Sequence, residues 1–466
     1  MRPPQPRSAK AKQRGAALMV MLVIMVMGAL TFLVGSLSKP GMQIERDKIT
    51  ANALAQAKDT LIGYAITYGD THTGQVHGYL PCPDPNGTAG ANGEGSSETC
   101  GNKNVSVVGR LPWKTLGLPP LRDGNGECLW YAVAGTYKNN PMTDIMNWDT
   151  NGLFEILDVN GTALAQDVVA VIFAPGATLN NQNRASDGTA PLCNGNYTAT
   201  NYLDSDGTLD NGTVSSSANA TTQFRLTSSS QINDQLIYIT RQDIWDAMLK
   251  RNDFMTTLTA MTQKATECIA DYGRRNNAGS GDKRLPWAGR FFPDSNDYLT
   301  DSNYDDENNR LSGRLPYRVN TSDNDSNNLI SGSSLYQLRS DGSNCPNVPT
   351  WSTTYYTWWT NWKDHLFYAL ADDFNPDSGS SSCGTCLSVN GSGSYAAVVM
   401  FAGKKLTTQV RSSSNDHLDF ANYLEGRNLS NHPNTSGNSD YQSGTETSSF
   451  NDVLYCINQG LSVMPC

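Results

Sequence analysis

The sequence predicts an α+β protein in which one long N-terminal helix precedes two tandem heads, each a helix packed on an antiparallel sheet. The first half of that helix is expected to cross a membrane, and its second half to be amphipathic. Three observations predict this fold: an uncharged apolar run follows a basic leader, six sequence blocks recur in the same order, and three of these blocks are rich in β-branched and aromatic residues. A helix laid on such a sheet buries the apolar faces of both.

Composition limits the function classes. The chain has 466 residues and a formal net charge of −10, and only 17% of its residues are charged, below the average of roughly 25%. Without basic clusters beyond the first residues, nothing would neutralise phosphates, so we expect no nucleic-acid partner. Ten cysteines scattered through polar, Gly-rich sequence predict structural disulfides and an oxidising compartment.

The first forty residues contain the apolar run. Residues 1–15 include five positive and no negative charges, and no charged residue occurs from Ala16 to Leu37. About 22 helical residues reach about 33 Å, enough to span a hydrocarbon core, and the basic leader would stay cytoplasmic. An ordinary secretory signal fits poorly because its apolar region is shorter. A plain signal-anchor remains an alternative.

Lys39-Pro40-Gly41 is expected to interrupt or kink the helix, and the helical pattern resumes from Ile44. Apolar residues then recur at helical spacing up to about Tyr68 and form one stripe: Ile44, Ile49, Leu54, Ala55, Leu61, Ile62, Ala65 and Ile66. Residues 16–69 are therefore predicted to form a single helix with a membrane-spanning half and an amphipathic half.

The rest of the chain contains an internal repeat. The first copy has the blocks GYLPCPD, GRLPWKT, LWYAVAG, VVAVIFAPGATL, NYLDSDG and NDQLIYIT; the second has KRLPWAGRFFPD, GRLPYRV, LFYALAD, AAVVMFAGKKL, NYLEGRN and NDVLYCI. Residues 240–275 are expected to form the leading helix of the second copy. The predicted organisation is a leader at 1–15, the helix at 16–69, a first head at 70–240 and a second head at 241–466.

The leader junction resembles that of a known family. A short basic leader ending in Gly15 and followed by AALMVMLV is similar to the prepilins of type IV pili and of type II secretion pseudopili. The resemblance implies that a prepilin peptidase cuts between Gly15 and Ala16 and that the new N-terminus is methylated. It also implies pilin or pseudopilin subunits as partners. The implied location is the bacterial inner membrane, with one span and a periplasmic C-terminus, and an extracytoplasmic filament.

One departure from the family points to a special position in the filament. The family usually has Glu at mature position five, where this chain has Val20. The resemblance implies that this Glu neutralises the terminal amine of a neighbouring subunit, and a subunit with nothing above it needs no such carboxylate. The K-type minor pseudopilin at the filament tip also lacks it, and some PilX-like minor pilins share the QRGAAL junction.

We therefore expect a minor pilin or pseudopilin with a structural or assembly role near a filament tip. An adhesin or binding module held on the same scaffold is the alternative, and a signal-anchored periplasmic enzyme is a third. No HxxxH, HExxH, GxSxG, Walker A or GxGxxG pattern in the expected context occurs, so enzymatic activity is not expected.

The cysteines predict pairs by proximity alone: Cys82 with Cys100, Cys128 with Cys193, and Cys456 with Cys466. Cys268, Cys345, Cys383 and Cys386 remain for the second head. Cys383 and Cys386 form a CxxC, which in another context indicates a redox or zinc site. Here it lies in Ser/Gly-rich sequence, which favours a structural disulfide.

Two further groups of residues are candidate binding sites. Calcium takes oxygen ligands, and the acidic clusters that offer them are Asp204, Asp206 and Asp210; Asp301 and Asp305 with Asp306 and Glu307; and Asp323 with Asp325. Solvated turns are the alternative. Aromatic residues crowd positions 351–362, and Trp351, Trp358, Trp359 and Trp362 are candidates for stacking on a sugar or a partner protein. A packed aromatic core is the alternative.

Overall fold

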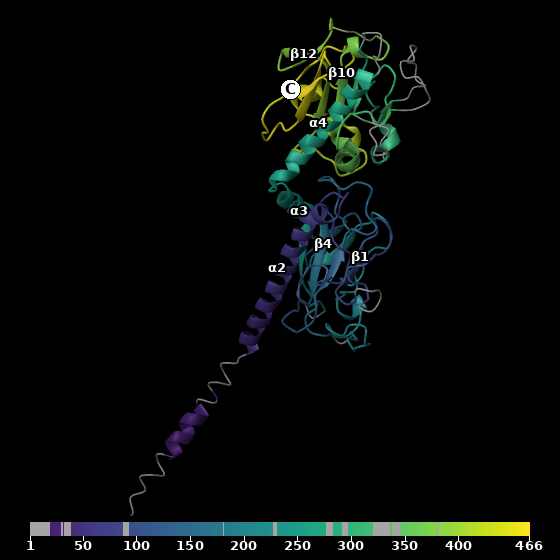
Figure 1. Cartoon of the computed structure of the whole chain (residues 1–466). Helices are drawn as coiled ribbons and strands as arrows, with labels where there is room; N and C mark the ends of the chain where they lie inside the picture. Colours follow the sequence, from purple (N-terminus) through teal and green to yellow (C-terminus); the bar gives the residue numbers. More distant parts are fainter. Residues whose placement is uncertain are drawn as a thin grey trace, which may run out of the picture.

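The computed structural model describes residues 19–28, 31, 39–86, 93–179, 181–226, 231–275, 283–290, 297–319, 336–337, 345, 347–378, 380 and 382–466. Two heads are stacked end to end, and a helix projects from the lower one (Figure 1). The C-terminus lies in the upper head, far from the projecting helix.

The first head contains a six-stranded sheet. Its strands are β1 (Val107–Arg110), β2 (Trp130–Val133), β3 (Phe154–Leu157), β4 (Ala163–Ala174), β5 (Thr222–Arg225) and β6 (Gln235–Thr240). The order is β1-β2-β4-β3-β5, and β6 pairs with β4. All pairs are antiparallel except β3 with β5. The long strand β4 is therefore the centre of the sheet.

The second head repeats this topology and extends it. Its main sheet contains β7 (Ser312–Arg314), β10 (Leu366–Leu370), β11 (Leu387–Val389), β12 (Ser392–Phe401), β13 (Asp440–Tyr441), β14 (Val453–Asn458) and β15 (Val463–Pro465). The order is β13-β11-β12-β10-β7, with β14 paired to β12. The parallel pair, β11 with β13, is also repeated. The added strand β15 pairs with β14. A separate ribbon joins β8 (Arg318–Val319) and β9 (Tyr336–Gln337).

The strand registers agree as well as the strand order. Gly109 lies opposite Tyr131 in the first head, and Gly313 lies opposite Tyr368 in the second, so the recurring GRLP and aromatic blocks occupy equivalent positions. The β4–β6 and β12–β14 ladders each contain an irregularity at the equivalent position. The two heads therefore share one fold, as the repeated blocks predict.

Three main helices pack on these sheets. Helix α2 (Lys39–Thr71) packs on β4 and β6, with Leu54, Leu61 and Ala65 buried. The expected single helix at 240–275 is instead two helices, α3 (Arg241–Met248) and α4 (Asn252–Arg275). Helix α3 packs on α2 and on the first sheet, whereas α4 packs on the second. The break between them lets the chain pass from one head to the other (Figure 1).

One continuous hydrophobic cluster runs through both heads. It includes Leu61 of α2, Ile172 of β4, Trp245 of α3, Leu258 of α4 and Val399 of β12, all at most 2% exposed. A second cluster lies on the other face of the first sheet, around Phe173. The heads thus share part of their core, and burial of that shared surface favours one fixed arrangement.

The prediction that half of the N-terminal helix spans a membrane has to be corrected. None of the helices in the described residues combines the length and apolarity that a membrane crossing needs. Helix α2 contains charged residues such as Glu45, Asp47 and Lys48. The predicted fold class, with its transmembrane helix, and the predicted single-span inner-membrane location are therefore wrong as stated, while the α+β heads remain.

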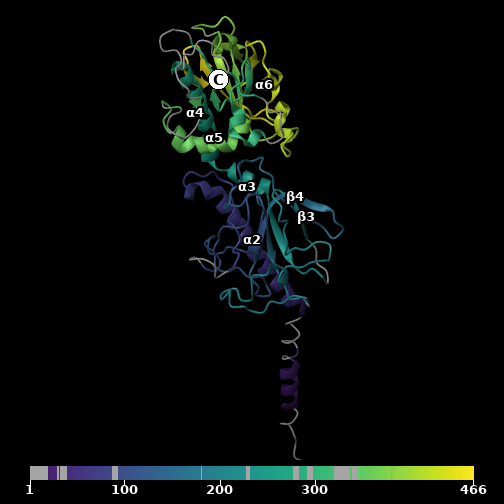
Figure 2. The same cartoon turned by 90° about the vertical axis from the view of Figure 1, so that its right-hand side faces the viewer.

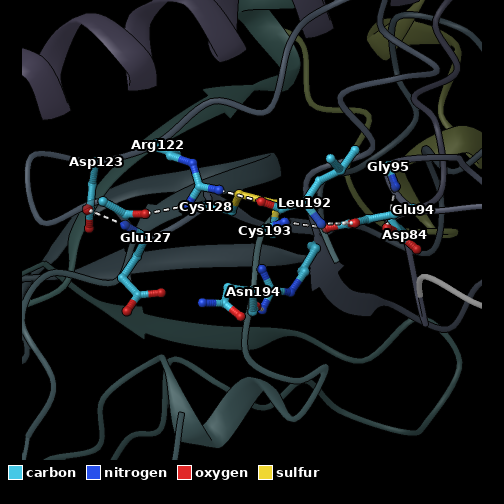
Figure 3. Close-up of a disulfide and its surroundings, with 12 residues drawn as sticks. Asp84, Glu94, Gly95, Arg122, Asp123, Glu127, Cys128, Leu192, Cys193 and Asn194 are labelled. Atoms are coloured by element: carbon cyan, nitrogen blue, oxygen red, sulfur yellow. Dashed lines mark hydrogen bonds between the residues drawn. A yellow bond between two sulfur atoms is a disulfide. The ribbon is translucent and has the colours of Figure 1, made fainter. Parts of the chain in front are cut away.

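The prediction of disulfide bonds is confirmed. The three pairs chosen by proximity form, and the remaining cysteines pair as Cys268 with Cys345 and Cys383 with Cys386. Figure 3 shows the Cys128–Cys193 bridge, beside which the Glu94 carboxylate accepts hydrogen bonds from the backbone N–H groups of Leu192 and Cys193, both at 2.7 Å. Five such bridges favour an oxidising, extracytoplasmic location.

Candidate functional site: the junction between the heads

A loop of the first head, residues 145–152, enters the second head. Met146 N–H donates to Asn361 Oδ1 at 2.7 Å, and Asn147 Nδ2 donates to the backbone oxygen of Asn361 at 2.8 Å. Asn151 Nδ2 donates to the Ser412 carbonyl at 2.6 Å. The loop is held in shape from within, because Asp149 N–H donates to Asn147 Oδ1. It thus presents a preformed surface to the second head.

Trp148 is the apolar anchor of this loop. It is 3% exposed, and its ring meets that of Trp362 edge to face with centroids 4.3 Å apart. Phe254 of α4 and Phe401 of β12 complete the contact. Trp362 ends α5 (Tyr356–Trp362), which lies on the side of the second head that faces the first (Figure 2). Aromatic pairs of this geometry add to the stabilisation from area burial.

Charged groups surround that anchor. His365 of the second head lies between two carboxylates: its Nε2 is 2.9 Å from Asp149 Oδ2 and its Nδ1 is 2.9 Å from Asp364 Oδ1. Arg411 Nη1 lies 3.2 Å from Asp149 Oδ2. We call Asp149, Asp364, His365, Arg411, His417 and Tyr423 the junction cluster; each is buried.

Electrostatics set the protonation of the cluster. Burial raises the pKa of Asp149, but Arg411 and His365 outweigh it and lower the pKa to about 2. Burial also opposes ionisation of Asp364, and His365 and His417 hold its pKa well below the usual range. For His365, burial lowers the pKa, but Asp364 and Asp149 outweigh it and raise the pKa. The geometry therefore fits an imidazolium that bridges a carboxylate from each head.

Trp148 gives His365 an alternative partner. The indole Nε1 of Trp148 lies 2.8 Å from Nε2 of His365, the same nitrogen that faces Asp149. An indole N–H donates only, so it can bond this nitrogen only when the nitrogen carries no proton. Protonated His365 pairs with Asp149, and neutral His365 accepts from Trp148.

Arg411 has a counterpart in the first head. Arg184 Nη1 donates to the Gly176 carbonyl at 2.9 Å, as Arg411 Nη1 donates to the Gly403 carbonyl at 3.0 Å. The spacing Leu-x-x-Gln-x-Arg recurs at 179–184 and 406–411. Arg184 pairs with Glu127 of its own head at 3.3 Å, whereas Arg411 pairs with Asp149 of the other head. A repeated structural arginine has thus become a contact between heads.

A polar cavity of about 280 Å³ adjoins the cluster. Amide, hydroxyl and carboxylate side chains from both heads line it, including those of Asn147, Asp149, Tyr298, Ser412 and His417. The Tyr298 ring stacks on His417 with centroids 4.0 Å apart. Asp149 Oδ1 is buried and accepts no hydrogen bond from the part of the chain that the structure describes. The cavity therefore offers acceptors and a ring to a polar ligand.

The first calcium candidates do not converge on one point. Asp206 Oδ2 pairs with Arg225 at 2.9 Å, and Asp210 Oδ1 caps the backbone N–H of Gly212 at 2.7 Å. Asp204 is only 2% exposed and accepts from Gln182 at 2.6 Å. In the described residues no group of three or more His, Cys, Asp or Glu is arranged to hold a metal ion. These carboxylates instead serve turns and ion pairs.

Asp204 forms a buried acid pair with Asp234. Asp204 N–H donates to Asp234 Oδ2 at 2.7 Å, and Asn233 N–H donates to Asp204 Oδ2 at 2.7 Å. Burial, and next the charge of Asp204, raise the pKa of Asp234 well above its usual range. Burial therefore favours the protonated form of Asp234, which limits the repulsion between the two carboxyl groups.

The second head repeats this acid pair. Glu425 N–H donates to Asp452 Oδ2 at 3.2 Å, and Asn451 N–H donates to Glu425 Oε2 at 3.1 Å. Burial, followed by the charge of Glu425, raises the pKa of Asp452 well above its usual range. The NYL-acid and Asn-Asp blocks supply both pairs, so the repeat preserves a polar network as well as a sheet.

The other acidic candidates are dispersed. Within the second head, Asp301 pairs with Lys363, and Glu307 pairs with Arg310 at 2.6 Å. Asp305 lies next to Asp306, which forms an isolated bridge with Gly289. Asp323 and Asp325 lie outside the described residues.

The aromatic candidates lie mostly inside the second head. Trp351, Trp359 and Trp362 are at most 1% exposed, and Trp359 stacks on Tyr317 with centroids 5.3 Å apart. Trp358 is half-buried and its ring contacts Phe254. Their packing stabilises the core and the junction.

The processing residues Gly15 and Ala16 lie outside the described residues. Val20 lies in the helical stretch at 19–28 and is 59% exposed. The sequence-based reasoning missed Asp149, His365 and Arg411. The recurring Leu-x-x-Gln-x-Arg spacing could have identified Arg411. Asp364 could also have been identified, because it lies two residues before the block LFYALAD, as Glu127 lies two residues before LWYAVAG. Nothing in the sequence marks Asp149.

Comparisons with protein-family models, curated proteins and solved structures found no match for this chain.

Proposed function

We propose that the protein is a structural and assembly subunit of an extracytoplasmic filament of the pilin or pseudopilin type, in a minor or tip position. The observation that carries this proposal is the junction: a shared core and a buried charge cluster join two copies of one fold into a single body. Such a body suits a load-bearing or spacing role. The leader junction at Gly15 and Ala16 supplies the resemblance to prepilins.

The chemistry of the junction cluster supports a structural role. His365 and Arg411 are balanced by Asp149 and Asp364, and all four are at most 4% exposed. Removing one partner of a buried ion pair typically costs about 3–5 kcal/mol. These groups therefore favour one arrangement of the heads over others.

The N-terminal part of α2 supports the proposal that neighbouring subunits are partners. Residues 41–49 are exposed, and Met42, Ile44 and Ile49 present 47%, 69% and 44% of their surface. Met42 and Ile49, seven residues apart, lie on the same side of the helix, and such exposed apolar side chains gain stability when another apolar surface covers them. We propose that other pilin or pseudopilin subunits provide that surface, and that prepilin peptidase acts on the Gly15–Ala16 bond.

The test uses the full chain in cells that produce it. Filaments sheared from the cells should contain the protein, immunogold should label them, and its N-terminus should be Ala16. The double variant Asp149→Ala/His365→Ala, which uncouples the heads, should enter filaments several-fold less. Asp144→Asn, an exposed change just before the same loop, should enter normally. Absence of the wild-type protein from filaments would overturn the proposal.

The junction cavity favours a second function, binding of a small hydroxyl-rich ligand. Its amide and hydroxyl lining and the Tyr298 ring match the groups that recognise sugars. A glycan array probed with the full chain should give hits that Tyr298→Ala abolishes and that Asp144→Asn, at the cavity rim, only weakens. Hits that Tyr298→Ala leaves unchanged would place binding elsewhere.

A further inference from the structure

Strand β6 of the first head has an uncovered edge. It pairs with β4 along one side, and no strand or bridge among the described residues pairs with its other side. Its equivalent in the second head, β14, has both sides occupied: β12 on one and the C-terminal strand β15 on the other. The same fold is thus present once with the added strand and once without it.

The register identifies which backbone groups face that edge. In the second head, Cys466 N–H donates to the Leu454 carbonyl at 3.3 Å and Asn458 N–H donates to the Ser462 carbonyl at 3.0 Å. Leu454 corresponds to Leu236, because each is the second residue of its strand in the ladder, opposite Met400 of β12 and Phe173 of β4. Alternation along an antiparallel strand then places the N–H groups of Leu236, Tyr238 and Thr240 on the outer side.

One of these three outward groups already has a partner. Thr240 N–H donates to Asp243 Oδ2 at 2.9 Å, as part of the N-terminal cap of α3. This bond confirms that position 240 points away from β4. The outward N–H and C=O groups of Leu236 and Tyr238 remain for an added strand.

A groove runs beside this edge. It has a volume of about 710 Å³ and lies between α2 and β6. Ala51 and Leu54 of α2 and Leu236 and Ile237 of β6 give it apolar lining, and it is also lined by the charged residues Arg46, Asp47, Asp123 and Asp234. In the second head, β15 likewise contacts both the sheet strand β14 and the helix α4. The first head therefore offers an added strand both backbone partners and a place for its side chains.

The sequence of β6 does nothing to block pairing. Native edge strands usually carry charges, Pro or bulges that prevent association. The β6 sequence QLIYIT contains no charged residue and no Pro. Its ladder with β4 is regular from Gln235 to Ile239. Such an edge is a template for strand addition.

We propose that the outer edge of β6 binds an extended, uncharged segment of a partner protein, which adds antiparallel to β6 as β15 adds to β14. The occupant follows from β15 itself, whose Val463, Met464 and Pro465 are uncharged and fill the equivalent position. This inference goes beyond the proposed function and does not depend on it.

The test measures binding of a labelled peptide to the full disulfide-bonded chain. The probe has the sequence of residues 460–466, with Ser replacing the last Cys. Fluorescence anisotropy should show saturable binding. Tyr238→Pro, which removes an outward N–H without touching the bonds to β4, should weaken binding at least tenfold. Tyr238→Val, which keeps that N–H, should bind within about threefold of wild type.

Hydrogen exchange on the wild-type protein gives a readout that needs no variant. The peptide should slow exchange at Leu236 and Tyr238, while Ile237 and Ile239, which face β4, are protected with or without it. No saturable binding, equal binding by Tyr238→Pro, or unchanged exchange at both outward amides would overturn the proposal. A dimer in sedimentation equilibrium that Tyr238→Pro dissociates would also overturn it, in favour of a second copy as the occupant.

Discussion

Asp149 of the first head places its Oδ2 2.9 Å from Nε2 of His365 in the second head, and both side chains are at most 2% exposed. Arg411 contacts the same carboxylate oxygen at 3.2 Å. A buried carboxylate with two cationic partners across an interface couples the stability of the two sides. The junction is therefore where single substitutions should affect both heads.

The first prediction concerns Asp149→Asn. It removes the charge that balances His365 and Arg411 and should lower the free energy of unfolding by about 3–5 kcal/mol, the usual cost of breaking a buried ion pair. Urea denaturation of the purified chain measures this loss. Asp144→Asn is the matched control, because its exposed pair with Lys103 should contribute at most about 1 kcal/mol. Equal effects of the two substitutions would contradict a special role for Asp149.

The second prediction concerns pH and His365. Because the folded pKa of His365 is raised, the folded state binds its proton more tightly than the unfolded state does. The stability from this group is complete below about pH 6.5, the usual value, and is lost as pH rises through the raised pKa. Melting temperatures should therefore fall from pH 6 towards alkaline pH, and His365→Gln should flatten this decline. An equally steep decline in the variant would refute the assignment.

The third prediction concerns the acid pair in the first head. The raised pKa of Asp234 means that stability falls as pH rises from about 4 through that pKa. Asp234→Asn places a permanent donor where the protonated carboxyl donates. We expect the variant to gain stability relative to wild type as pH increases from 4 to 8. Asp204→Asn, which removes the charge of Asp204 but leaves Asp234 ionisable and buried, should not show this gain in urea unfolding at the same pH values.

The fourth prediction compares two disulfides. Cys128 and Cys193 close a loop of 65 residues, whereas Cys383 and Cys386 are three residues apart. Loop-closure entropy assigns about 4 kcal/mol to the longer loop and about 1.5 kcal/mol to the shorter. Paired Cys→Ser variants at each bridge, compared by chemical denaturation, should lose stability in that order. The reverse order would show that local packing outweighs chain entropy.

The repeated sheet could be predicted because its information is local. Blocks such as LWYAV and LFYAL combine strand-forming residues with flanking Gly and Asn, and their order fixed the equivalence of the heads. The short parallel partners β5 and β13 were not predicted. They lie in Ser/Asn/Gly-rich tracts that resemble loops, and only their neighbours β3 and β11 make them strands.

The junction could not be predicted, because it depends on contacts between residues more than 200 positions apart. Asp149 lies outside the six recurring blocks, and His365 occupies the position where the first head has Cys128. Their meeting depends on the break between α3 and α4, which sets how one head follows the other. Helical periodicity in 240–275 indicates a buried face but gives no sign of that break.

The two heads share a core and a buried charge cluster, so they should move as one rigid body. Spin labels at the exposed positions Val159 and Glu446, introduced as non-natural amino acids so that the disulfides stay intact, report the distance between the heads. Double electron–electron resonance should give one narrow distance distribution in the wild type and a broad one in Asp149→Ala/His365→Ala. A broad distribution in the wild type, or a narrow one unchanged by the double substitution, would contradict the account.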